Sequence, residues 1–162
     1  MTSRPRIAFP ALLCLLPGVP ASAGEAPLRL AATGVQVYTC AAAGSGFAWR
    51  LDHPDAVLVD GTGRTRVRHG QGPTWRGLDG STITGEVVAT IPAPRAGAIP
   101  WLVARVSQRS GEGLLHGVSL VVRTDTQGGV APADGCGAAT LGGSVAVPYR
   151  ASYLFVEPAP QG

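Results

Sequence analysis

The stretch STITGEVVATI, residues 81–91, decides the fold class of this chain. Apolar or small residues occupy one set of alternate positions and mostly polar residues the other, which is the period of two that a half-buried β-strand requires. No stretch of the sequence shows a sustained apolar period of 3.6 residues, so helices are not expected to build the core. The inward set is expected to be Ser81, Ile83, Gly85, Val87, Ala89 and Ile91.

Similar short runs recur along the chain, separated by turn residues. Asp60-Gly61, Asp79-Gly80 and Asp134-Gly135 are turn signals, because Asp and Gly tolerate the positive φ of tight reversals. The strongest hairpin prediction lies at residues 60–63. In residues 114–122 the expected inward set includes His116 among aliphatic residues. Further strands are expected at residues 35–40, 47–51, 56–60, 64–69, 101–107, 114–122, 145–149 and 151–156.

This spacing of short strands and turns predicts an all-β chain. The expected architecture is an antiparallel β-sandwich or barrel-like single domain with long Gly/Pro-rich loops. The 23 glycines and 14 prolines of the chain fit such loops.

The first 23 residues read as a secretory signal peptide. Arg4 and Arg6 precede an apolar run at residues 7–19, and Ala21-Ser-Ala23 supplies small residues for cleavage. The run is too short and too broken by proline for a membrane span, so no transmembrane segment is expected. The mature chain, residues 24–162 with a core at about 28–156, is expected to be secreted, to the periplasm or the extracellular space.

The charge balance argues against a nucleic-acid partner. Removing the signal takes two of the 13 basic residues and none of the 10 acids, leaving 11 against 10 and a net charge of +1. No basic excess remains to attract phosphate. A ridge of Arg64, Arg66 and Arg68 on one strand face is expected to be a solvated surface, with anion binding as the alternative.

Removing the signal also leaves two cysteines, Cys40 and Cys136. In an exported protein such a pair is most simply a disulfide. It would close a loop of about 97 residues, which stabilises by about 4–5 kcal/mol in the chain-entropy model. A metal or redox pair is the alternative, but there is no Cys-x-x-Cys, and two thiols alone make an incomplete zinc site.

The most plausible ligand site is HGQGPTWRGLDGS, residues 69–81. Its glycines and proline shape the backbone, and Trp75 either contacts a ligand or plugs the end of the sheet. Trp49 and Trp101, in apolar runs, are expected in the core. The candidate ligand-binding residues are His69, Trp75, Arg76 and Asp79.

Catalysis has weaker support in the sequence. No Gly-x-Ser-x-Gly is present, although His69, Asp79 and Ser81 would make a triad if they converged in space. The histidines at 53, 69 and 116 are too far apart to form a ligand pair, so neither a metal site nor a cofactor is predicted.

Several motifs in fixed order resemble the exported bacterial and fungal family catalogued as domain-of-unknown-function family 3455. The resemblance covers about residues 28–156 and implies a secreted β-rich domain without an established activity. Some fungal relatives carry a malate dehydrogenase label, which we reject because the chain lacks Gly-x-Gly-x-x-Gly and a βαβ rhythm. Relatives often place an aromatic after the histidine, where this chain has Gly70. The motifs are Gly34-Val-Gln-Val-Tyr-Thr-Cys40, Trp49 with Pro54-Asp-Ala56, His69 with Gly72-Pro-Thr-Trp75, Asp79-Gly-Ser81, Ile99-Pro-Trp-Leu102, Arg123-Thr-Asp-Thr126, Gly128-Gly-Val-Ala-Pro132, Cys136 and Tyr149-Arg-Ala-Ser-Tyr153-Leu-Phe155.

Two functions stay open at this point. The first is a non-catalytic envelope or extracellular domain, either structural or binding a glycan or surface polymer through the loop at residues 69–79. The alternative is a secreted hydrolase or metal-assisted enzyme that uses His69 with Asp79 or Asp125. A carboxylate within hydrogen-bond reach of a His69 that opens to a cavity would favour the enzyme.

Overall fold

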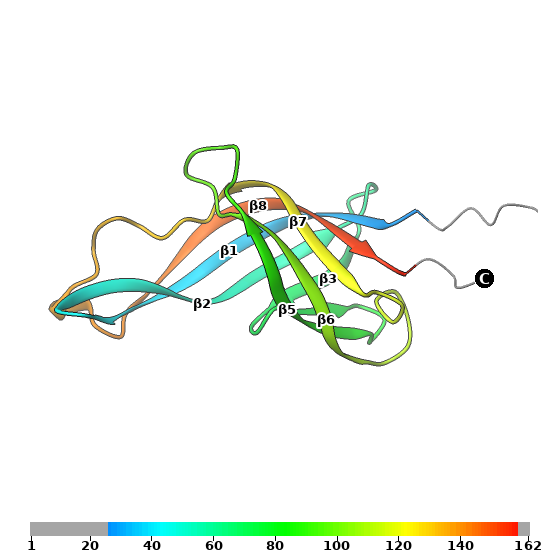
Figure 1. The fold of residues 1–162 in the computed structure, drawn as a ribbon, viewed down its shortest axis with the longest axis horizontal. Coiled ribbons are helices and arrows are strands. Elements are labelled where there is room, and N and C mark those ends of the chain that lie inside the picture. Colours follow the sequence, from blue (N-terminus) through cyan, green and yellow to red (C-terminus); the bar gives the residue numbers. More distant parts are fainter. Residues whose placement is uncertain (1–25, 159–162) are drawn as a thin grey trace, which may run out of the picture.

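The computed structural model of the chain describes residues 26–158 and is built from β-strands (Figure 1). Each strand pairs antiparallel with the next, and the last pairs with the first, so the sheet closes into a barrel. The all-β prediction is confirmed, and the barrel-like architecture is the one adopted. The elements are β1 (Leu28–Ala43), β2 (Gly46–Val59), β3 (Thr65–Gly70), β4 (Thr74–Gly77), β5 (Thr82–Ile91), β6 (Trp101–Ser110), β7 (Leu120–Gly128), a 3-10 turn (Ala138–Thr140) and β8 (Ser144–Val156).

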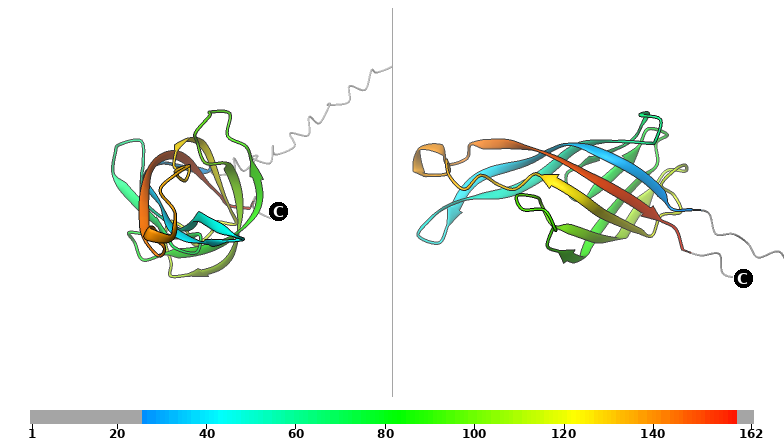
Figure 2. Two further views of the ribbon diagram at one scale, coloured as in Figure 1. Left: turned by 90° about the vertical axis from the view of Figure 1, so that its left-hand side faces the viewer. Right: turned by 90° about the horizontal axis from the view of Figure 1, so that it is seen from above.

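Closure places alternate side chains of every strand in one interior. Viewed along the long axis, the strands surround this interior (Figure 2). An aromatic cluster of Trp75, Tyr153 and Phe155 lies at its centre, with ring centroids 6.3–6.5 Å apart. Gly85 leaves room for it, because a Cβ there would stand 3.2 Å from the Trp75 ring. Fully burying one large apolar side chain stabilises the fold by about 1.5–3 kcal/mol, so this interior supplies most of the driving force.

Strands β1, β2 and β8 run on past the others and form a narrow three-stranded extension (Figures 1 and 2). Residues 46–55 of β2 and 144–148 of β8 pair there only with β1, which lies between them. Pro54 and Pro148 fall in these segments. Proline is tolerated there because each strand has a neighbour on one side only.

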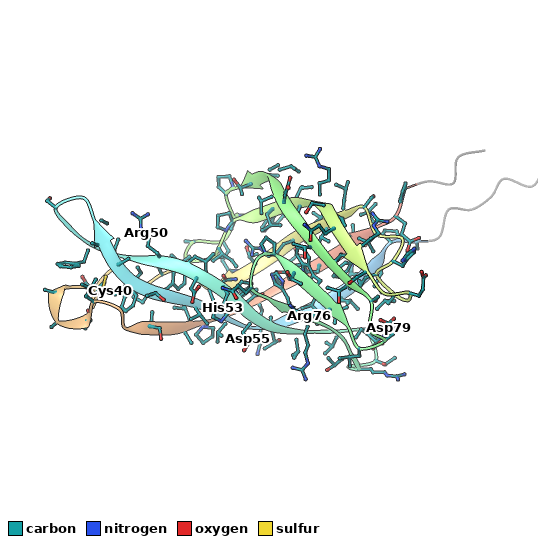
Figure 3. All side chains as sticks on the ribbon, turned by 90° about the horizontal axis from the view of Figure 1, so that it is seen from below. Cys40, Arg50, His53, Asp55, Arg76 and Asp79 are labelled. Carbon is teal, nitrogen blue, oxygen red and sulfur yellow. A yellow bond between two sulfur atoms is a disulfide. The ribbon has the colours of Figure 1, made fainter. Side chains whose placement is uncertain are left out.

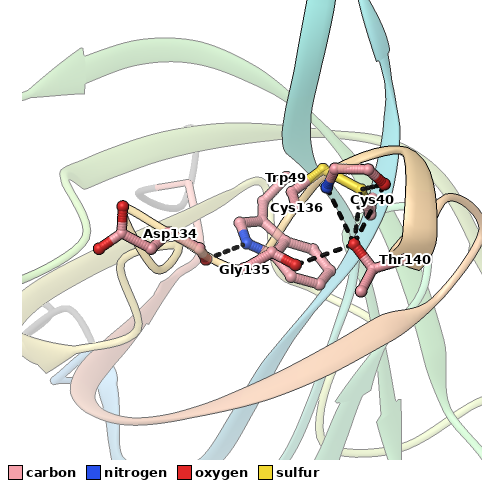
Figure 4. Close-up of a disulfide and its surroundings, with 7 residues drawn as sticks. Cys40, Trp49, Asp134, Gly135, Cys136 and Thr140 are labelled. Carbon is pink, nitrogen blue, oxygen red and sulfur yellow. Dashed lines mark hydrogen bonds between the residues drawn. A yellow bond between two sulfur atoms is a disulfide. The ribbon is translucent and has the colours of Figure 1, made fainter.

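The predicted disulfide joins Cys40 and Cys136, with their Cα atoms 5.3 Å apart (Figure 4). Cys40 lies on the middle strand of the extension, and Cys136 lies in the segment that connects β7 to β8. The Trp49 indole N–H donates to the Asp134 carbonyl at 2.9 Å, and the Thr140 hydroxyl donates to the Gly135 carbonyl at 2.9 Å. The bond and these contacts hold the connecting segment against the extension.

The hairpin prediction at residues 60–63 is confirmed by the β2–β3 turn. One carboxylate oxygen of Asp60 accepts from the Thr62 hydroxyl at 2.6 Å and from the Thr62 and Arg64 amides at 3.0 and 3.2 Å. These bonds lower the pKa of Asp60 to about 2, the hydroxyl of Thr62 being the largest cause.

Two pairs of predicted strands are single strands in the structure. The runs at 47–51 and 56–60 are both part of β2, so residues 52–55 are extended and not a turn. The runs at 145–149 and 151–156 are both part of β8. At residues 52–55 Pro54 indicated a turn, and the one-sided pairing of the extension explains why β2 continues through it.

The strand predicted at residues 114–122 was wrong over residues 114–119, and only residues 120–122 belong to a strand. Residues 111–117 form bends and turns, and β7 begins at Leu120. Gly111 and Gly113 adopt positive φ, which reverses the chain before a strand can form. His116 is consequently exposed, whereas the prediction placed it among buried aliphatic residues. In β7 the inward residues are Val121 and Arg123, one position away from the predicted set.

Strand β5 follows the predicted alternation only in its first half. Ser81, Ile83 and Gly85 are buried, but Val87 and Ile91 are 46% and 53% exposed. The β5–β6 ladder shifts register at Thr84/Gly85 and again at Val87/Ala89. The second half of β5, residues 86–91, therefore contributes no buried side chain to the interior.

The two other tryptophans are less buried than expected. Trp49 and Trp101 are half-buried, and neither is among the core residues. Trp49 packs at the extension, where its indole N–H is bonded to Asp134.

The signal peptide predicted for residues 1–23 lies outside the described residues. No helix in the range 26–158 has the length and apolar character needed to cross a membrane.

Loss of the disulfide is expected to destabilise the protein. Replacing both Cys40 and Cys136 by serine should lower the free energy of unfolding by about 4 kcal/mol, because the unfolded chain regains the entropy of a loop spanning 96 residues. Urea unfolding of the variant and of reduced wild type measures this, and the two should share a midpoint. A midpoint equal to that of oxidised wild type would contradict the expectation.

Candidate functional site

The structure separates the four candidate residues into two groups. His69 and Trp75 are buried in the interior, whereas Arg76 and Asp79 are exposed. Asp79 lies at the end of the molecule from which the termini emerge, opposite the end that carries Cys40 (Figure 3). The stretch 69–81 is also more regular than predicted, because its centre forms strand β4.

Pairing of β3 with β4 brings His69 and Trp75 together. The two residues are direct partners in this ladder, so their side chains emerge on the same, inward face. Their rings stack with centroids 4.7 Å apart and an interplanar angle of 3°. The rings of His69 and Tyr153 meet at an interplanar angle of 64°, with their centroids 5.5 Å apart. Trp75 is 1% exposed, so it anchors the interior, and only a ligand that entered the barrel would reach it.

His69 is held as a neutral imidazole. Its Nδ1 lies 3.0 Å from the carbonyl oxygen of Thr74 and must carry the proton to bond it. Burial lowers the pKa of His69 to about 4, and the charge of Arg123 acts in the same direction. At neutral pH the second ring nitrogen, Nε2, is therefore an unprotonated acceptor.

A cavity of about 230 Å³ opens beside this stack. Each strand from β1 to β7 contributes at least one lining residue. Its floor is polar and buried, and consists of Gln36, His69, Trp75 and Arg123. Its apolar rim includes Leu51 and Val87, which are 56% and 46% exposed. The remaining lining residues are Asp52, Pro54, Gly72, Pro73 and Leu102.

Three buried donors on this floor have no hydrogen-bond partner within the described residues. They are the side-chain amide nitrogen of Gln36, the indole N–H of Trp75 and the Nε–H of Arg123. An unpaired buried donor costs about 1–3 kcal/mol, so native proteins seldom keep one without a role. Three of the residues that line this cavity therefore carry a donor that the described part of the protein leaves unpaired.

Arg123 is the buried charge of this interior. One of its Nη atoms donates to the Pro100 carbonyl at 2.8 Å, and no carboxylate of residues 26–158 lies within 4.0 Å of its guanidinium. The three tyrosines of the chain, Tyr38, Tyr149 and Tyr153, are buried near it. Burial raises the pKa of each tyrosine, and the charge of Arg123 offsets part of that increase.

Comparison with protein families identifies the chain. The family described as a protein of unknown function, DUF3455, matches residues 20–157. The chain belongs to this family. No curated protein and no solved structure matches it.

In this DUF3455 domain the side chain of Asp79 stabilises a turn through hydrogen bonds. Its Oδ1 accepts from the Ser81 hydroxyl at 2.6 Å and from the Ser81 amide at 3.1 Å, and its Oδ2 accepts from the Leu114 amide at 2.7 Å. These bonds, led by that of the Ser81 hydroxyl, lower the pKa of Asp79 to about 2. The Ser81 hydroxyl also accepts from the Leu115 amide at 3.2 Å, so both residues are occupied in fixing the 111–115 segment.

The carboxylates named for the enzyme alternative do not contact His69. No carboxylate in the described part of the chain is a hydrogen-bond partner of its ring. Asp125 is exposed and lines a different cavity, beside Trp101 and Thr126. It lies 4.0 Å from Arg29.

The arginines of this region lie on the outer face of the sheet. Arg68 and Arg76 are direct partners in the β3–β4 ladder and are both exposed. Arg66 bonds Asp60 at 3.2 Å, and Arg64 lies before β3 in the turn. Arg76 therefore faces away from the cavity that His69 and Trp75 line.

The other two histidines lie on the surface with acidic neighbours. His53 lies 3.2 Å from Asp52, and His116 lies 3.6 Å from Glu112. Between Ala26 and Pro158 no group of three or more His, Cys, Asp or Glu side chains is placed to hold a metal ion.

Sequence reasoning missed Gln36 and Arg123. Both occupy inward positions of strands whose inward neighbours are apolar or aromatic, such as Tyr38 and Val121. The usable signal was a long polar side chain on the buried parity of a strand. That signal depends on a correct register, and the predicted register of β7 was off by one residue.

Asp79→Asn is expected to reduce stability without affecting the cavity. Asparagine has one acceptor oxygen, whereas Asp79 accepts from Ser81 with one oxygen and from Leu114 with the other, so the free energy of unfolding should fall by about 1–2 kcal/mol. The matched control, Asp125→Asn, should change it by less than about 0.5 kcal/mol. Urea unfolding of both variants checks this, and equal midpoints would show that the turn does not depend on Asp79.

The burial of His69 predicts a pH-dependent stability. The unfolded chain binds a proton at its imidazole below pH 6.5, but the folded chain binds it only near pH 4. Stability is therefore fully present above pH 6.5 and is lost as the pH falls toward 4. Between pH 7 and pH 4.5 the loss from this residue should be about 2–3 kcal/mol.

The matched variant is His69→Phe, which keeps an aromatic ring against Trp75. Urea unfolding at both pH values should show a smaller difference between them for this variant than for wild type. Equal differences would mean that His69 is not the titrating group. Asp60 and Asp79, with pKa values of about 2, lose their stabilising charge only at more acidic pH.

Proposed function

We propose that this domain is an exported, non-catalytic binding protein whose ligand enters the cavity above Gln36, His69, Trp75 and Arg123. The observation that carries the proposal is that three of the residues that line one cavity each carry a buried donor without a partner. A ligand that accepts these bonds would relieve a cost that the free protein bears. Export is inferred from the leader at residues 1–23, and the Cys40–Cys136 disulfide is compatible with it.

The size of the cavity limits the ligand. Pockets for drug-sized molecules occupy roughly 300–1,000 Å³, and this one has about 230 Å³. It suits a small molecule or the terminal unit of a glycan or surface polymer. Eight-stranded barrels commonly have room for one small ligand at most. The exposed rim residues Leu51 and Val87 offer apolar contact to the part of the ligand that stays outside.

The cavity has the mixed character of a binding site. Its floor fixes orientation through a few polar groups, and its rim is largely apolar. Trp75 and His69 form a rigid stacked wall, because their rings are held by the β3–β4 ladder and by the Thr74 carbonyl. A site built on strands in this way is pre-organised, which lowers the entropy lost on binding.

The enzyme alternative has less support in this geometry. A general base needs a partner that orients it and a route to the substrate proton. His69 opens to a cavity, but a backbone carbonyl orients it, and Asp79 is occupied by Ser81 and Leu114. The rigid, donor-rich floor supports binding better than turnover.

The test is a glycan array together with a thermal-shift screen of small metabolites, applied to wild type and to Gln36→Met. Methionine keeps the length of the glutamine side chain and removes its amide donor. We expect wild type to bind a ligand, and the variant to bind it at least about tenfold more weakly without a lower melting temperature.

Thr126→Val is the matched control. Thr126 is also buried with an unpartnered hydroxyl, but it lines the other cavity, so this variant should bind as wild type does. Equal binding by wild type and Gln36→Met, or no ligand at all in either screen, would count against the proposal.

A further inference from the structure

We infer that the cavity binds a carboxylate, which the guanidinium of Arg123 receives at the floor. This rests on the proposed binding function and specifies the chemical class of its ligand. Arg123 reaches the cavity from β7 and is 9% exposed.

The first reason is a buried charge without a counter-charge. A buried arginine is normally paired, because removing a charge from water is costly unless an opposite charge replaces the lost hydration. An Nη atom of Arg123 donates to the Pro100 carbonyl, and its Nε–H has no partner within the described residues. A carboxylate would supply both the missing acceptor and the missing negative charge.

The second reason is the excess of donors around Arg123. Trp75 and Gln36, which also line this cavity, each carry a buried donor without an acceptor: the indole N–H and the side-chain amide nitrogen. A carboxylate has two oxygens and about four lone-pair sites, so it can accept from all three residues at once. A neutral hydroxyl or amide would leave at least the charge of Arg123 uncompensated.

The third reason concerns the magnitude of the ligand charge. His69 is neutral at pH 7, so Arg123 is the positive group of the floor. Asp52 also lines the cavity, and its carboxylate lies 3.2 Å from His53. A cavity with one positive floor residue and one negative rim residue suits a ligand with a single negative charge. Asp52 would repel a phosphate dianion more strongly than it would repel a monoanion. The neutral Nε2 of His69 remains available to accept a bond from a hydroxyl of the same ligand.

The test compares three pairs of molecules. In each pair one member carries a carboxylate and the other carries a neutral group in its place: acetate with acetamide, benzoate with benzamide, and glucuronate with glucose. Binding is measured by thermal shift and calorimetry at pH 7 and constant ionic strength. We expect the carboxylate of at least one pair to bind about tenfold or more tightly than its neutral partner. Acetate is small enough to reach Arg123 whatever the rest of the natural ligand is.

Variants then assign the preference to Arg123. Arg123→Gln should remove the preference for the carboxylate, and Arg123→Lys should retain part of it, because a point charge replaces the guanidinium. Trp75→Phe keeps the stack with His69 and removes the indole donor, so it should weaken carboxylate binding even if Arg123→Gln fails to fold. Trp101→Phe removes the unpartnered buried indole donor outside this cavity and should leave binding unchanged.

The possible outcomes distinguish failure of the carboxylate inference from failure of the proposed binding function on which it rests. Equal binding of neutral and anionic partners, or a preference that survives in Arg123→Gln and Trp75→Phe, would overturn the carboxylate and leave a binding cavity. Tighter binding of inorganic phosphate than of every carboxylate would overturn the argument from charge. No binding of any probe, together with a negative glycan and metabolite screen, would overturn both.

Discussion

The ladder between β8 and β1 is the constraint on which the rest of the structure depends. It closes the sheet, so the inward residues of all eight strands share one interior. In a closed sheet an inward polar group has no free edge or open face through which to reach water. Its hydrogen bonds must come from a neighbour in the barrel or from whatever occupies the cavity. This is why Gln36, Trp75 and Arg123 deserve a functional explanation, whereas exposed Arg68 and Arg76 do not.

The sequence was sufficient for the fold class, for the disulfide and for the turn at Asp60, because each depends on a local pattern or on a count. The alternation of residues 81–85 and the Asp-Gly dipeptides act over a few residues, and the two cysteines that follow the predicted leader leave one pairing. Boundaries were less predictable. A proline such as Pro54 indicates a break only if its strand has two neighbours, and the number of neighbours is a property of the assembled sheet.

The candidate site was predicted in part for the same reason. His69 and Trp75 were found because a tryptophan among glycines and a proline stands out in the sequence. That they stack depends on their being partners in the β3–β4 ladder, and β4 has only four residues, too few to show a period. Gln36 and Arg123 required a correct register on β1 and β7. Asp79 was conspicuous in the sequence because it belongs to an Asp-Gly turn dipeptide, and in the structure its side chain stabilises that turn.

An unpaired arginine inside a small barrel would be removed by selection for stability alone, because an apolar side chain of similar volume would fit there at lower cost. Proteins sit only modestly above the stability they need, so such a group persists where function requires it and the remainder of the fold compensates. Here the compensation is visible in the apolar and aromatic packing around Trp75, Tyr153 and Phe155 and in the long loop closed by Cys40–Cys136. The part of β1 that lies in the extension carries that disulfide, and its partner β2 brings Leu51 and Pro54 to the cavity. The extension and the interior are therefore structurally linked. The strands that hold the β7–β8 connection in place also form the rim above the buried charge.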